Sequence, residues 1–79
     1  MTTPLEIARA ARDAAGLADH YAYIDRVNAH TAYKAAVEAE QDIDEAHVAY
    51  KAAVEADNAA SVVYREAQEA FLAAGGDGI

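Results

Sequence analysis

The sequence contains no cysteine, which excludes disulfide bonds, thiolate metal sites and cysteine nucleophiles. Proline occurs once and glycine four times, and neither occurs between Leu17 and Ala74. Because these two residues are the usual interrupters of helices, a long helical segment is expected there. Basic residues are also scarce: six Lys and Arg stand against fourteen Asp and Glu, for a formal net charge of −8. This balance argues against direct binding of nucleic acid or of an anionic membrane, since both need positive surface.

Long apolar runs are missing as well. No run approaches the ~20 residues of a membrane-spanning helix, and the N-terminus lacks the basic start and apolar core of a signal peptide. We therefore expect a soluble cytoplasmic protein. The alanine content and the excess of Arg over Lys are typical of a GC-rich genome, such as that of an actinobacterium or its phage. A phage accessory protein would work in the host cytoplasm or in the virion.

Large apolar side chains are few, although 54% of the residues are hydrophobic, because 23 of the 79 residues are alanine. Alanine is the strongest helix former, and Glu, Arg, Lys and Gln supply much of the rest. The composition therefore predicts an all-α protein that folds as one small domain over residues 1–79. A domain of this size gains only about 3–5 kcal/mol from its own core, so self-association into a homo-oligomer is expected.

The N-terminal helix has well-defined start and stop signals. Thr3 is an N-cap residue, Pro4 occupies the first helical position and Glu6 completes a Thr-x-x-Glu capping box. Gly16 is suited to the left-handed position that follows a helix. These signals predict a short helix over about residues 4–15.

A second helical segment is predicted over about residues 19–74, with Asp19 as its N-cap and the glycines of a flexible tail, residues 75–79, after its end. The segment would bend or break near residues 42–45, where Asp-x-x-Glu resembles a capping box, or near residues 57–58. Neither place contains Gly or Pro. One long helix and two helices therefore remain alternatives.

Two sequence patterns bear on this choice. The eight residues Ala32–Ala39 recur unchanged as Ala49–Ala56, and two copies on two packed helices would favour a hairpin. A recent duplication in an alanine-rich chain explains the repeat equally well. The second pattern is heptadic and favours continuity through residues 42–45, so we prefer one long helix that is bent or broken at one of these two places. Its alanine column consists of Ala32, Ala39, Ala46, Ala53, Ala60, Ala67 and Ala74.

This heptad pattern predicts the self-association surface. Small residues in one column let helix axes approach closely, and the tyrosines and the phenylalanine beside it would act as larger knobs. We expect an antiparallel coiled coil or helical bundle formed by several copies. The residues predicted to make it are Ala39, Ala46, Tyr50, Ala53, Ala60, Tyr64, Ala67 and Phe71.

Five carboxylates lie within eight residues, and no Lys or Arg occurs between positions 35 and 50. They could form an ordinary solvated face or a surface that binds a basic partner protein. They are Glu38, Glu40, Asp42, Asp44 and Glu45. A third interpretation is a metal site, because Glu40, Asp44 and His47 can share one helix face, as the ligands of ferritin-like bundles do. Such a site would need symmetry-related copies to complete it.

Catalytic signals are weak. Ser61 is the only serine and has no Gly-x-Ser-x-Gly context, and a glycine-rich phosphate loop is missing. The sequence therefore predicts a non-enzymatic oligomerisation and protein-interaction module without a cofactor. Two alternatives remain: an acidic inhibitor or anti-defence protein that blocks a basic, nucleic-acid-binding partner, and a ferritin-like metal binder assembled by symmetry.

Overall fold

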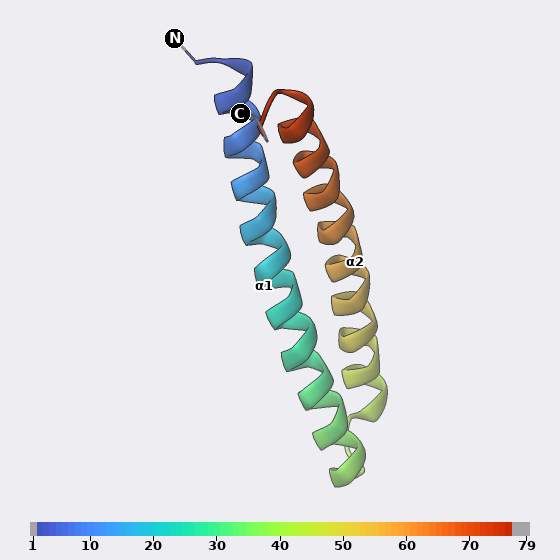
Figure 1. Ribbon diagram of the computed structural model, residues 1–79. Helices are drawn as coiled ribbons and strands as arrows, with labels where there is room; N and C mark the ends of the chain where they lie inside the picture. Colours follow the sequence, from blue (N-terminus) through green and yellow to red (C-terminus); the bar gives the residue numbers. More distant parts are fainter. Residues whose placement is uncertain (1, 77–79) are drawn as a thin grey trace.

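The protein is an antiparallel hairpin of two helices, seen in the computed structural model, which describes residues 2–76 (Figure 1). Helix α1 spans Pro4–Ala39 and helix α2 spans Ile43–Ala73. The two helices lie side by side along a rod of 57 × 19 × 15 Å. The turn is at one end of the rod, and the start of α1 and the end of α2 are at the other (Figure 1). The all-α prediction is confirmed.

The start of α1 follows the predicted signals. Thr3 has extended backbone geometry, and its hydroxyl Oγ1 accepts a hydrogen bond of 3.1 Å from the Glu6 backbone N–H. Pro4 begins the helix, where its missing N–H costs nothing. The predicted end near residue 15 is wrong, because α1 continues to Ala39. Gly16 lies inside the helix, where the aromatic ring of Tyr64 from α2 packs against it.

The continuous helix over residues 19–74 is also wrong, and so is the break near 57–58. Asp19 and Asp57 are both within helices, and their side chains face the opposite helix. The chain turns at residues 40–42, at the edge of the other predicted break. The hairpin indicated by the internal repeat is therefore the correct alternative.

The turn begins with a hydrogen-bonded helix end of the Schellman type. The N–H of Gln41 donates to the carbonyl of Ala36 and the N–H of Glu40 donates to that of Val37. Glu40 occupies the left-handed position, φ 56°, at which glycine is the usual residue. Asp42 is left-handed as well, at φ 55°, and its side chain makes no capping hydrogen bond. The predicted Asp42-x-x-Glu45 capping box is therefore wrong.

Helix α2 ends as its glycines indicate. Gly75 is left-handed, its N–H donates to the Leu72 carbonyl, and the Gly76 N–H donates to that of Phe71. The described part of the predicted tail, residues 75 and 76, is thus a hydrogen-bonded turn. Residues 77–79 lie outside the described residues.

The core is a single thin layer between the helices. Ala15 and Phe71 are its buried apolar residues, and the guanidinium of Arg12 covers the Phe71 ring at 4.0 Å from the ring centre. Two helices cannot enclose a side chain on all sides. Consequently most large apolar residues keep a substantial exposed fraction.

Candidate functional site

The face between α1 and α2 is built on two columns of alanine. In each helix an alanine recurs every seventh residue on the side that faces the other helix, where small side chains permit close approach. The columns are Ala8, Ala15, Ala22, Ala29 and Ala36 in α1, and Ala46, Ala53, Ala60 and Ala67 in α2, with Ala74 as the residue that follows α2.

Seven of the eight predicted self-association residues lie on this face, within one chain. Phe71 is buried, and the six others, Ala46, Tyr50, Ala53, Ala60, Tyr64 and Ala67, are partly buried. Ala39, the eighth, is exposed at the end of α1. The predicted register therefore describes the inner face of α2 but not that of α1, where Ala29 and Ala36 are partly buried and Ala32 and Ala39 are exposed. The partner of this face is α1 of the same chain.

Two pairs of polar side chains also connect α1 and α2 along this face. Arg26 Nη1 donates a hydrogen bond of 3.0 Å to Asp57 Oδ2, and this bond raises the pKa of Arg26. One turn further along the hairpin, the Ser61 hydroxyl donates to Asp19 Oδ1 at 2.9 Å. Neither pair is predicted from the sequence, because Asp19 and Asp57 are both typical of helix ends. One signal was present: Asp57 occupies the same heptad column as Tyr50, Tyr64 and Phe71.

An aromatic cluster joins the helices near the turn. Tyr33 and Tyr50 stack with ring centres 6.0 Å apart, His30 lies 5.3 Å from Tyr50, and His47 lies 5.6 Å from Tyr33. The four residues form two pairs separated by the repeat length of 17 residues, which extends the repeat seen in the sequence to His30 and His47. The cluster is therefore nearly two-fold symmetric.

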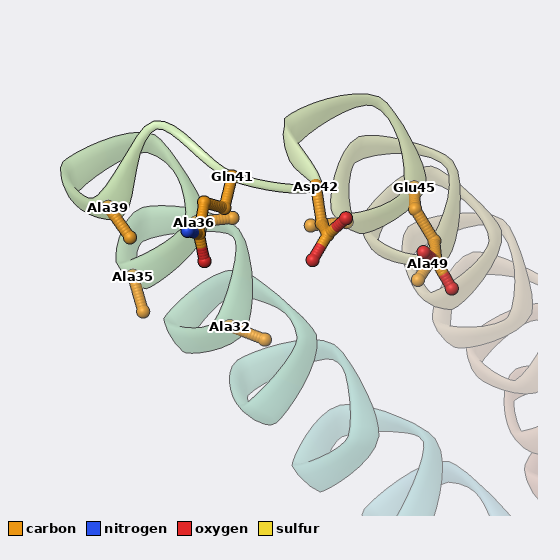
Figure 2. A pocket seen from close by; sticks show the side chains of 9 residues that line it. Ala32, Ala35, Ala36, Ala39, Gln41, Asp42, Glu45 and Ala49 are labelled. Carbon is orange, nitrogen blue, oxygen red and sulfur yellow. The ribbon is translucent and has the colours of Figure 1, made fainter.

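The five clustered carboxylates gather around the turn, and all five residues are exposed. A groove of about 570 Å³ lies beside them, between the last turns of α1 and the first turns of α2. Six alanines line it, together with Gln41, Asp42 and Glu45. Figure 2 shows Asp42 at the mouth of this groove, between the two helices. The turn end of the hairpin thus combines a small apolar hollow with negative charge.

The candidate metal ligands are not brought together within one chain. Among residues 2–76, no group of three or more His, Cys, Asp or Glu side chains is arranged to hold a metal ion. The ring of His47 packs against Tyr33 instead. A metal site that includes Glu40, Asp44 or His47 would need further ligands from other copies of the chain.

A second apolar surface runs along α1 on the side away from α2. Leu17 and Ile24 are each preceded and followed, at a distance of two residues, by residues that face α2. A step of two residues rotates a side chain by about 160–200° around the helix axis, so Leu17 and Ile24 point away from α2. We call this surface the outer stripe; its residues follow alternating steps of three and four. They are Ile7, Ala10, Ala14, Leu17, Tyr21 and Ile24. All six are exposed, Leu17 to 56% and Tyr21 to 58%. The outer stripe is not recognisable from a predicted helix that ends near residue 15, because half of its length lies beyond that residue.

Neither α1 nor α2, the helices of the described part of the chain, is apolar enough over a sufficient length to cross a membrane. No protein-family model, curated protein or solved structure matches this chain.

Proposed function

We propose that this chain is a non-enzymatic interaction module whose hairpins associate with one another through the outer stripe. The acidic turn end then stays free to contact a partner protein with a basic surface. The proposed self-association rests on the amount of uncovered surface. The proposed contact with a basic partner rests on the location of the carboxylates.

The uncovered surface is large for the mass of the chain. The hairpin exposes 5633 Å², whereas a compact monomer of 8.3 kDa exposes about 4,600 Å². The excess of about 1,000 Å² is similar to the ~800 Å² that each partner buries in a standard protein–protein interface. This excess is the observation that carries the proposal.

The outer stripe is the surface best suited to bury that area. It contains no charged residue over five helical turns, and its spacing is that of a helix that packs lengthwise against another helix. Two copies aligned antiparallel along α1 would place Ile7 of each beside Ile24 of the other, with Leu17 near the centre. The result is a four-helix assembly in which every helix has an apolar neighbour.

The test compares two substitutions that add the same charge at different places. Leu17→Glu puts a carboxylate in the centre of the outer stripe. Val48→Glu puts one on the outside of α2, where Val48 is 67% exposed. Mass would be measured by light scattering over a dilution series, with circular dichroism on the same samples. We expect the natural chain and Val48→Glu to have a solution mass that is a multiple of 8.3 kDa. We expect Leu17→Glu to be a helical monomer.

Two results would overturn the proposal. The first is a natural chain that stays a folded monomer at the highest concentration reached. The second is equal dissociation by Leu17→Glu and Val48→Glu, which would place the interface elsewhere. A loss of helicity in Leu17→Glu at high concentration would show that folding and assembly are one event; Leu17→Ala would then replace it, with reduced affinity as the expected result.

A further inference from the structure

We propose that the chain also forms an open dimer, in which one continuous helix replaces the turn and α1 of each copy packs against α2 of the other. The partner is a second copy of this chain, and the interface is the face that closes the hairpin. This inference does not depend on the outer stripe.

The turn is held in an unfavourable backbone geometry. Glu40 and Asp42 both have positive φ, at 56° and 55°, a region that side chains with a Cβ avoid. No glycine relieves either position, and the Asp42 side chain makes no capping hydrogen bond. In a continuous helix both residues would adopt ordinary helical angles. The strain therefore belongs to the closed form alone.

The heptad pattern runs through the turn in phase. The column that faces α2 in α1 and the column of large residues that faces α1 in α2 are one series with a step of seven. Its members are Ala8, Ala15, Ala22, Ala29, Ala36, Ile43, Tyr50, Asp57, Tyr64 and Phe71. Ala36 and Tyr50, on either side of the turn, would thus point the same way on an uninterrupted coiled helix. Opening the turn keeps this column on one side of the helix.

Three contacts across the hairpin are symmetric about one point. The pairs Arg26 with Asp57, Tyr33 with Tyr50, and Arg12 with Phe71 all have their sequence midpoint between Gln41 and Asp42. Two straight antiparallel copies that cross at this midpoint would form every one of these pairs twice, now between chains. The open dimer therefore keeps these three pairs, each of them now between the two chains.

Short hinges under strain are known to favour such an exchange of identical elements. The clustered carboxylates oppose it here, because those of both copies would gather around the crossing point. We therefore expect high salt to favour the open dimer and low salt to favour the hairpin. Variants that test the backbone geometry of the turn must therefore carry the same number of carboxylates.

The test uses two double variants with the same charge. Glu40→Ala/Asp42→Ala and Glu40→Gly/Asp42→Gly both remove two carboxylates, but alanine favours a helix and glycine favours positive φ. We expect the dissociation constant of the open dimer to be lower in the alanine variant by roughly a hundredfold or more, since each dimer contains two hinges. Both variants would be annealed at high concentration in high salt.

The readout is energy transfer within one chain. Because the chain has no cysteine, Arg9→Cys and Glu69→Cys provide two unique labelling sites, both exposed and on different helices. In the hairpin the labels lie on helices about 8–10 Å apart, whereas along a continuous helix they lie about 90 Å apart. A small amount of doubly labelled chain is mixed with excess unlabelled chain. A labelled chain then associates almost only with unlabelled chains, and the measured transfer is between the two labels of one chain.

For the alanine variant we expect low energy transfer and a solution mass of at least twice 8.3 kDa. For the glycine variant we expect high energy transfer. The natural chain should shift from high to lower transfer as concentration and salt rise. High transfer in the alanine variant at every concentration would overturn the proposal. A dimer through the outer stripe retains the closed hairpin and hence high transfer, so the two modes of association fail or succeed separately.

Discussion

Arg26 and Asp57, which are 31 residues apart in the sequence, form an ion pair of 3.0 Å that connects the middle of α1 to the middle of α2. The two partners differ in exposure. The Asp57 side chain is 9% exposed, whereas the Arg26 side chain is 41% exposed. The consequences of losing either partner should therefore differ.

We predict that Arg26→Ala destabilises the hairpin more than Asp57→Ala does. Without Arg26 a buried carboxylate has lost its partner, which is the costly case. Without Asp57 the guanidinium can turn to water, and the loss should be about 1–2 kcal/mol. Urea unfolding followed by circular dichroism measures both values. A double variant, Arg26→Met/Asp57→Leu, should recover most of the stability; the reverse order of the single variants would contradict this account.

Gly16 and Tyr64 predict an unusual response to alanine. Replacing a glycine within a helix by alanine normally stabilises the helix by about 1 kcal/mol. Here the added Cβ of Gly16→Ala would lie 2.9 Å from Tyr64 Cε2, so the ring or the helix has to move. We expect no gain in the melting temperature, or a loss.

A double-mutant cycle separates helix propensity from this contact. In a Tyr64→Ala background the space beside Gly16 is open, and Gly16→Ala should then stabilise by the usual ~1 kcal/mol. Equal effects of Gly16→Ala in both backgrounds would show that the Tyr64 ring does not restrict this position.

The acidic turn end predicts salt-dependent binding of a basic probe. A fluorescent lysine-rich peptide would be titrated with the hairpin at increasing ionic strength. Affinity should fall steeply as the screening length drops below ~10 Å. The triple variant Glu38→Gln/Glu40→Gln/Asp44→Asn should weaken binding about tenfold at low salt, equivalent to 1.4 kcal/mol.

The matched control removes the same number of charges elsewhere. Glu55, Glu66 and Glu69 are exposed on α2 away from the turn, and changing all three to Gln should reduce affinity much less. Equal losses in the two triple variants would indicate attraction to net charge alone. Binding that does not respond to salt would argue against an electrostatic docking surface.

Local signals were reliable where one residue acts on its immediate neighbours. The Thr3 cap depends on a hydrogen bond to a residue three positions away, and the glycines after α2 act on the adjacent turn. The inward face of α2 was also predictable, because a repeated column of alanines beside Tyr50, Tyr64 and Phe71 has a definite period. The identity of the opposite helix could not be read from that period.

Three residues were misinterpreted because their role depends on the other helix. Gly16 is typical of a helix end, but here it makes room for the Tyr64 ring. Asp19 and Asp57 are typical of caps, but each bonds a side chain across the hairpin. Local propensities for these residues amount to about 1 kcal/mol or less, and contacts between helices can exceed that.

The helical class of this protein, the start of its first helix after Thr3 and the presence of an alanine column that faces another helix can all be predicted from the amino-acid sequence. Each of these properties depends on propensity or on a period within one segment. The reversal of the chain at residues 40–42 and the role of α1 as the partner depend on how the two helices pack. No glycine or proline marks the turn, so its position depends on the fit of one complete face against another, including the Arg26–Asp57 pair. The same fit leaves the outer stripe exposed, because a helix with two apolar faces can cover only one of them in a two-helix fold.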